Sequence, residues 1–112
     1  MSTLPELGII EGYFGSPWRW ADRTHVMRTL AGHGYGFFIY APKADAHLRR
    51  RWREPHPTAE HEALAAFAVA CRATGVRFGI GLSPFEVFRQ FDDAARSALK
   101  LRVAQLDSLG LD

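Results

Sequence analysis

The sequence predicts an α/β protein made of three parallel βα units. Three short apolar segments with the composition of strands alternate with three segments in which apolar residues recur at helical spacing. The connections are short, and strands joined through helices in this way lie parallel, with right-handed crossovers. The strands are expected at residues 7–11, 35–41 and 76–82, and the helices at 22–31, between 58 and 75, and between 92 and 110.

The first strand leads into a loop of glycines and aromatic residues. Glu11 is a polar residue at the end of this apolar strand, and the chain continues as Gly12-Tyr13-Phe14-Gly15-Ser16-Pro17-Trp18. Loops that follow the carboxyl ends of parallel strands are where α/β proteins bind ligands. Gly12 and Gly15 have no side chain, so a ligand can approach the backbone closely. A tight turn with exposed aromatic residues is the alternative interpretation.

Each predicted helix has one apolar side and ends at a glycine. The apolar sides comprise Val26, Met27, Leu30 and Ala31, then Leu64, Phe67, Ala68 and Cys71, then Ala95, Leu99, Val103 and Leu106. Thr58 is expected to be the N-cap of the second helix, and Asp92 or Asp93 to open the third. The helices are expected to end at Gly32 with Gly34, at Gly75 and at Gly110.

The second and third strands differ in pattern. Residues 35–41 (YGFFIYA) are apolar on both faces, as a covered parallel strand is, and Pro42 ends the segment. Residues 76–82 alternate between larger apolar and smaller or polar residues up to Ser83-Pro84. Three strands are too few to close a parallel barrel. The chain also stops after Gly110, where a fourth strand is expected. We therefore expect residues 1–112 to be the first three units of a TIM (β/α)8 barrel, or to associate so that the open sheet edges are covered.

Composition narrows the class of protein. The 112 residues are 47% hydrophobic with a formal net charge of +2, which favours a globular domain and gives little support to nucleic-acid binding. A single cysteine, Cys71, allows no intrachain disulfide and no cysteine-based metal site. The apolar runs are shorter than a membrane span, and no signal peptide opens the chain. We expect a cytoplasmic protein with no metal, cofactor or membrane partner.

Polar or flexible residues follow all three strands. In a barrel, Gly12, Lys43 and Ser83 share one rim and are candidates to line one pocket. Lys43 follows an apolar strand and a proline, where its ammonium can reach a hydroxyl or carboxylate of a ligand. An exposed loop lysine without a ligand is the alternative.

An arginine-rich segment follows the second strand. Arg49, Arg50, Arg51 and Arg53 surround Trp52, and Glu54 follows. Such a run is able to bind RNA or phosphate, in which case affinity falls steeply with salt. More often it is a solvated face whose arginines pair with carboxylates such as Glu54. The neighbouring histidines lack the spacing of a known metal motif.

Four segments in register resemble glycoside hydrolase family 84, the β-N-acetylglucosaminidases that act on O-linked N-acetylglucosamine, with some bacterial enzymes named hyaluronidases. The segments are residues 8–18 (GIIEGYFGSPW), 40–43 (YAPK), Arg49 with 52–55 (WREP), and 81–84 (GLSP). The family's usual pattern differs at three places. Tyr13-Phe14 stand in reverse order, Ala44 replaces an aspartate, and Phe85 replaces a glycine, which implies a divergent branch.

The resemblance implies roles for individual residues. The Gly12 carbonyl and the Lys43 ammonium would bind sugar hydroxyls, with Phe14 in the same subsite and Asp45 supporting the rim loop. Arg49 and the Trp52-Arg53-Glu54 group would brace the second loop, which makes nucleic acid an improbable partner. The partner implied is a glycan or glycoprotein that contains N-acetylglucosamine. A non-catalytic carbohydrate-binding or interaction module is the alternative function.

The family's reaction is substrate-assisted and retaining, with an oxazoline intermediate formed by the substrate's own acetamido oxygen. One aspartate orients the acetamide, and its neighbour is the general acid and base. That pair follows the fourth strand of the family's barrel. Asp92-Asp93 is expected to be a helix N-cap instead. We therefore expect no catalytic residue in this chain, and activity only with a complete barrel.

Overall fold

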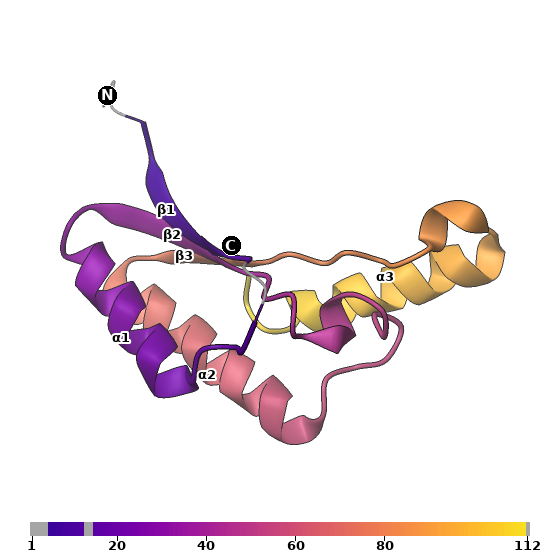
Figure 1. Ribbon diagram of the computed structural model, residues 1–112, viewed down its shortest axis with the longest axis horizontal. Coiled ribbons are helices and arrows are strands. Elements are labelled where there is room, and N and C mark those ends of the chain that lie inside the picture. Colours follow the sequence, from indigo (N-terminus) through magenta and orange to yellow (C-terminus); the bar gives the residue numbers. More distant parts are fainter. Residues whose placement is uncertain (1–4, 13–14, 112) are drawn as a thin grey trace.

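The computed structural model describes residues 5–12 and 15–111 and shows three parallel strands with three helices (Figure 1). The strands are β1 (Leu7–Glu11), β2 (Tyr35–Tyr40) and β3 (Arg77–Ile80). They form one sheet in the order β1-β2-β3, with both pairs parallel. The helices are α1 (Trp20–Ala31), α2 (Thr58–Thr74) and α3 (Asp93–Asp107), and short 3-10 turns occupy Ala46–Leu48 and Val87–Arg89. The predicted order of three parallel βα units is confirmed.

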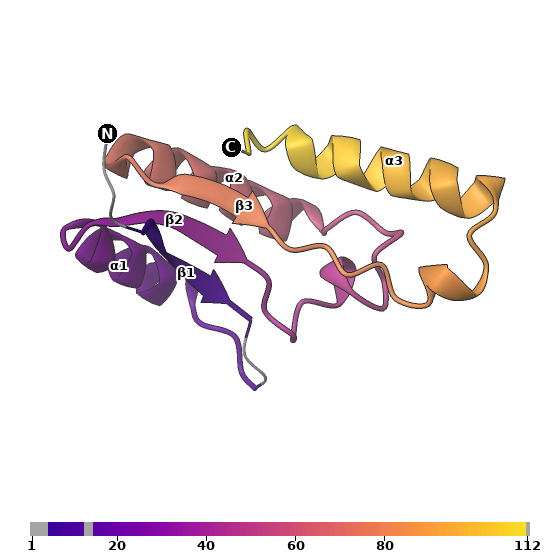
Figure 2. The ribbon, with the colours of Figure 1, turned by 90° about the horizontal axis from the view of Figure 1, so that it is seen from above.

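Helices α1 and α2 cover one face of the sheet, and the opposite face is bare in this chain (Figures 1 and 2). The core lies between these layers. Phe67 of α2 contacts Phe38 and Phe78 edge to face, with ring centroids 5.0 and 5.3 Å apart. Alternate residues of a strand point to opposite faces. Phe38 is therefore buried under the helices, while Ile10 is 66% exposed on the other side.

Helix α2 follows the predicted pattern closely. Its buried residues are Leu64, Phe67, Ala68 and Cys71, the four that the spacing predicts. It ends at Gly75, whose φ of 80° is the left-handed conformation that glycine adopts readily. The predicted N-cap is wrong, because Thr58 is the first helical residue and Pro57 occupies the cap position without a side-chain hydrogen bond. The proline presets the extended backbone from which the helix starts.

Two other helix predictions need correction. Helix α1 begins at Trp20 rather than Asp22, and its first hydrogen bond runs from the Arg23 amide to the Arg19 carbonyl, 2.9 Å away. In α3, Val103 was expected on the buried side but is 52% exposed. Arg102 is buried in its place, at 2% exposure. The guanidinium of Arg102 has buried hydrogen-bond partners, whose contribution outweighs the hydrophobic preference for valine.

The strands are slightly shorter than expected. β2 ends at Tyr40 and β3 spans Arg77–Ile80, yet ladder-like hydrogen bonds continue past both ends. The Ala41 amide donates to the Glu11 carbonyl at 3.0 Å, and the Gly81 amide donates to the Tyr40 carbonyl at 2.9 Å. The carboxyl ends of all three strands are thereby held at one edge of the sheet.

Candidate functional site

The predicted ligand-binding residues lie along this carboxyl edge. Gly12 follows β1 directly, and Lys43 follows β2 after Ala41 and the buried Pro42. The Ser83 amide donates to the Leu48 carbonyl at 2.7 Å, which ties the segment after β3 to the loop after β2. The structure thus brings the candidate segments to one edge, as the sequence predicts. Phe14, the fourth candidate, lies outside the described residues.

Gly12 and Lys43 are both accessible from this edge. Gly12 is half-buried, and a Cβ built on it would lie 3.7 Å from an Ile10 methyl and 3.9 Å from the Ala41 carbonyl. These are ordinary contacts, so the packing does not itself demand glycine, and the small residue leaves the backbone approachable. Lys43 is exposed on the loop between β2 and α2.

A buried ion pair supports the end of β1. Arg23 of α1 donates from Nε to Glu11 Oε1 at 2.5 Å and from Nη2 to Oε2 at 2.7 Å. The two residues are 1% and 2% exposed. Bidentate geometry satisfies both carboxylate oxygens, which a buried charge requires. The residue next to Gly12 is therefore fixed to α1.

The Arg23 guanidinium also contacts two aromatic rings. Its central carbon lies 4.1 Å from the ring centroid of Trp20 and 5.0 Å from that of Tyr40. Trp20 and Tyr40 themselves stack at 5.7 Å with an interplanar angle of 21°. Because the rings' electron-rich faces attract the cation, this cluster helps to compensate the desolvation of Arg23.

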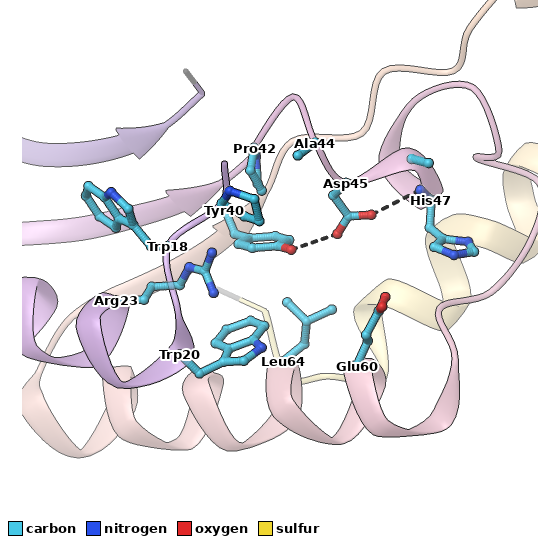
Figure 3. A pocket seen from close by; sticks show the side chains of 12 residues that line it. Trp18, Trp20, Arg23, Tyr40, Pro42, Ala44, Asp45, His47, Glu60 and Leu64 are labelled. Atoms are coloured by element: carbon cyan, nitrogen blue, oxygen red, sulfur yellow. Dashed lines mark hydrogen bonds between the residues drawn. The ribbon is translucent and has the colours of Figure 1, made fainter. Parts of the chain in front are cut away.

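Asp45 is the best-supported polar residue of the loop after β2. Its Oδ2 accepts hydrogen bonds from the Tyr40 hydroxyl at 2.7 Å and from His56 Nε2 at 2.9 Å. Its Oδ1 accepts from the His47 amide at 3.0 Å. Figure 3 shows the carboxylate between Tyr40 and His47. These contacts attach the loop after β2 to the sheet and to His56, and the role of Asp45 in the sugar site stays a prediction.

The protonation of His56 follows from its second neighbour. Arg102 Nη2 lies 2.8 Å from His56 Nδ1, and a guanidinium has donors only. Nδ1 is therefore the acceptor, and Nε2 carries the proton that is donated to Asp45. Arg102 Nη2 also donates to the His47 carbonyl at 3.4 Å, so α3 is attached to the same loop.

The pKa values of this network reflect burial opposed by hydrogen bonds. Burial favours the neutral form of Asp45, but hydrogen bonds from His56, Tyr40 and the His47 amide prevail and lower its pKa below the usual value. Burial and the neighbouring Asp45 charge raise the pKa of Tyr40 far above that of a free phenol. Burial lowers the pKa of Arg102, and the Asp45 charge partly opposes that shift.

A cavity of about 310 Å³ lies on the helix side of the rim (Figure 3). Aromatic and apolar groups from α1, β2, α2 and the loops after β1 and β2 form most of its wall, and Asp45 and Glu60 contribute carboxylates. Its lining includes Pro42 and Ala44 but neither Lys43 nor Gly12. The residues on either side of Lys43 therefore line the cavity, which is formed by neither of the two predicted ligand-binding residues.

The arginine-rich segment has structural contacts. Trp52 is 2% exposed and donates from Nε1 to the Phe85 carbonyl at 3.3 Å, and the Arg53 guanidinium lies 4.7 Å from its ring centroid. Arg51 forms an exposed ion pair with Glu54 at 2.5 Å. These contacts fit the expected bracing of the loop, and they link it to the segment that follows β3.

Asp92 is the N-cap of α3, as the sequence predicts. Its carboxylate accepts from the Ala95 amide at 2.8 Å, and that hydrogen bond lowers the pKa of Asp92. Asp92-Asp93 is the only adjacent aspartate pair in the sequence.

Among residues 5–12 and 15–111, no three histidine, cysteine or acidic side chains cluster so as to hold a metal ion. Within the same ranges, no helix combines the length and apolar character that crossing a bilayer requires.

Sequence reasoning missed four supporting residues: Arg23, Tyr40, His56 and Arg102. Two of them carried a detectable signal. Arg23 falls on the apolar side of α1 with Met27, and Arg102 falls between Leu99 and Leu106 on that of α3. A charged residue in an apolar stripe indicates a buried charge that needs a partner. Glu11, a carboxylate at the end of an apolar strand, was the matching signal for Arg23.

The fold and the residues at the carboxyl edge of the sheet together define the class of protein. It is an α/β protein of parallel βα units with its candidate ligand-binding residues at the carboxyl ends of the strands. More specifically, the chain belongs to the NAGidase family of beta-N-acetylglucosaminidases, whose family model matches residues 7–112. The family assignment made from the four segments is confirmed.

Individual relatives agree with this assignment. The chain is 30% identical over 103 residues to Protein O-GlcNAcase of Rattus norvegicus and, to the same extent, of Mus musculus. The match covers 92% of this chain and 11% of each relative, so the chain spans about a tenth of their length.

Solved structures show the same fold. A mutant O-GlcNAc hydrolase of Thermobaculum terrenum is similar with a TM-score of 0.87 and 24% identity, over 95% of this chain and 23% of that one. CpGH84B is similar with a TM-score of 0.87 and 26% identity, over 95% of this chain and 19% of its own. The three βα units therefore superimpose on part of each larger structure.

Proposed function

We propose that residues 1–112 form the first part of a (β/α)8 catalytic domain and supply one wall of an N-acetylglucosamine subsite. The observation that supports this most is the placement of Gly12 and Lys43 on the same carboxyl edge in a member of the beta-N-acetylglucosaminidase family. Ligands of barrel proteins bind at this edge. The proposed partner is a glycan or glycoprotein that carries N-acetylglucosamine, which the names of the relatives also indicate for those proteins.

Within this subsite, the Gly12 carbonyl accepts a hydrogen bond from a sugar hydroxyl and the Lys43 ammonium donates to another. A charge-assisted hydrogen bond of this kind contributes about 1.5–3 kcal/mol. Phe14 is proposed to lie in the same subsite, and Asp45 to hold the loop that carries Lys43. Gly12 and Lys43 orient the sugar and do not exchange protons with it.

The proposed reaction is retaining hydrolysis assisted by the substrate. The acetamido oxygen of the substrate attacks the anomeric carbon, the glycosidic bond breaks, and an oxazoline forms. Water then opens the oxazoline and restores the configuration. One carboxyl group orients the acetamide, while another protonates the leaving oxygen and later deprotonates water. Since Asp92 caps α3, we propose that this pair comes from a part of the barrel outside residues 1–112.

The test uses the gene product that carries these residues and an aryl N-acetylglucosaminide. We expect Lys43→Ala to lower kcat/KM about tenfold or more, because a charge-assisted hydrogen bond is lost. Lys100→Ala, which changes the other, exposed lysine on α3, is the matched control and should leave kcat/KM unchanged. A Lys43→Ala enzyme with unchanged kinetics would show that the subsite lies elsewhere.

A non-catalytic carbohydrate-binding module is the second candidate. It is compatible with the capping role of Asp92, which is equally compatible with a catalytic pair elsewhere in the barrel. Calorimetry with N-acetylglucosamine separates the two candidates. Binding that depends on Lys43, without hydrolysis by the gene product, would favour the module. A gene product that neither binds nor hydrolyses the sugar would exclude both candidate functions.

A further inference from the structure

We infer that Tyr40 is a positioning residue. It fixes the end of β1, where Gly12 follows, relative to the loop between β2 and α2 that carries Lys43. This inference rests on the proposed function for the identity of the ligand. It concerns a residue whose hydroxyl and ring are engaged by contacts within the protein. Tyr40 lies at the end of β2, between the two loops, and contacts the buried polar group that anchors each of them.

On one side, the Tyr40 ring faces the group that anchors β1. Its centroid lies 5.0 Å from the Arg23 guanidinium carbon, and Arg23 holds both oxygens of Glu11. Glu11 directly precedes Gly12, and in the ladder it is paired with Tyr40 itself. A displacement of the Tyr40 ring would therefore disturb the ion pair on which the position of Gly12 depends.

On the other side, the Tyr40 hydroxyl holds the loop of Lys43. It donates to Asp45 Oδ2 at 2.7 Å, and Asp45 stands two residues after Lys43. Asp45 has three donors in all, and its side chain is 7% exposed, so little of the carboxylate is available to a ligand. Its role is consequently to hold the loop, and Tyr40 is the donor that comes from the rigid sheet.

The network continues into α3 through His56 and Arg102. The Arg102 contact fixes the imidazole as the tautomer with Nε2 protonated, which is the one that donates to Asp45. A chain of contacts thus runs from Glu11 through Arg23, Tyr40, Asp45 and His56 to Arg102. Tyr40 connects its two halves, one formed by an ion pair and the other by hydrogen bonds.

The decisive variant is Tyr40→Phe, which keeps the ring over Trp20 and Arg23 and removes only the hydroxyl. We expect the affinity for N-acetylglucosamine, or kcat/KM where the gene product is hydrolytic, to fall by about tenfold to about 100-fold because the lysine is misplaced. Tyr35→Phe makes the same change at the other end of β2 and is the matched control. It should leave both quantities unchanged.

A double-mutant cycle separates positioning from a general loss of stability. If Tyr40 acts through the placement of Lys43, Tyr40→Phe should have little further effect in a Lys43→Ala background. Additive effects would mean that the hydroxyl acts independently of Lys43 and would overturn the inference.

His56→Gln, which retains a donor for Asp45 and an acceptor for Arg102, should restore most of the function that His56→Ala removes.

Backbone amide NMR provides a readout that does not depend on sugar binding. Tyr40→Phe should shift the amide resonances of residues 43–47 and weaken the His56 Nε2–H signal, while Tyr35→Phe should not. If these shifts occur in a protein that neither binds nor hydrolyses the sugar, the positioning role of Tyr40 would stand and the proposed function would be refuted. Unshifted loop resonances together with unchanged affinity would overturn the positioning role.

Discussion

At the scale of single residues, two buried carboxylates near the strand ends are stabilised in different ways. Glu11 has a bidentate arginine, so its charge is neutralised directly. Asp45 accepts hydrogen bonds from a phenol, an imidazole and a backbone amide, so its charge is stabilised by several donors. Loss of one partner of the Glu11 pair should therefore lower the free energy of unfolding. For Asp45, acidification should lower it, because these hydrogen bonds lower the pKa of its carboxyl group.

Removing one partner of the Glu11–Arg23 pair should destabilise the fold strongly. Glu11→Gln leaves the Arg23 guanidinium buried without a counter-charge, at an expected cost of about 3–5 kcal/mol in the free energy of unfolding. The double variant Glu11→Leu with Arg23→Met removes both charges and should cost less than either single change. Urea denaturation measures both effects, and a double variant less stable than both single variants would contradict this account.

Asp45 should make the stability depend on pH in the acid range. Its pKa is lower in the folded chain than in the unfolded one, so its contribution is fully present above the ordinary aspartate pKa of about 3.9 and is lost as pH falls through the lowered value. The difference in unfolding free energy between wild type and Asp45→Asn should therefore shrink on acidification. A constant difference from neutral pH to below 3.9 would show that Asp45 does not titrate with folding.

At the scale of elements, hydrophobic spacing predicted the order and type of all six strands and helices. It failed where a polar contact replaced an apolar one. Val103 and Arg102 are neighbours on α3, both are at positions compatible with the apolar side, and hydrophobicity favours valine for burial. Arg102 is buried because of His56 and the His47 carbonyl, which lie 46 and 55 residues away in sequence. No local pattern encodes a pairing over such distances.

The same limit applies to the candidate site. Gly12 and Lys43 were identified because they follow strand ends, and parallel topology alone brings those ends to one edge. The supporting residues Tyr40 and His56 were missed because their role depends on side-chain geometry across the loop. Tyr40 belongs to an apolar run, so its spacing predicts a core aromatic ring, which it is, and says nothing about its hydroxyl.

The close approach of the ends of β2 and β3 should require glycine at position 81. A Cβ built on Gly81 would lie 2.7 Å from the Ala41 Cβ, and both atoms are attached directly to backbone. Gly81→Ala should therefore separate the ends of β2 and β3 and lower the free energy of unfolding by about 1–3 kcal/mol. Gly79→Ala is the control, since its Cβ would meet Ile39 Cγ1 at an ordinary 3.7 Å. Equal losses from the two changes would contradict this explanation.

At the scale of the whole molecule, the three βα units bury only one face of the sheet. Phe37 and Ile39 border a shallow cavity of about 310 Å³ on the other face, beside Gly79. In a closed barrel, the face opposite the helices is the packed interior. In the barrel that we propose, the apolar residues of this face would be covered. The chain matches about a fifth of each larger solved structure.

The 112-residue chain on its own should consequently self-associate through this face. Contiguous exposed apolar area and open strand edges both favour association. Ile10→Lys places a charge on the face, and we expect it to shift the sedimentation distribution toward monomer. Val69→Lys is the matched control, because Val69 is similarly exposed, at 62% against 66% for Ile10, but lies on α2. If both variants sediment alike, the association would not use the bare face of the sheet.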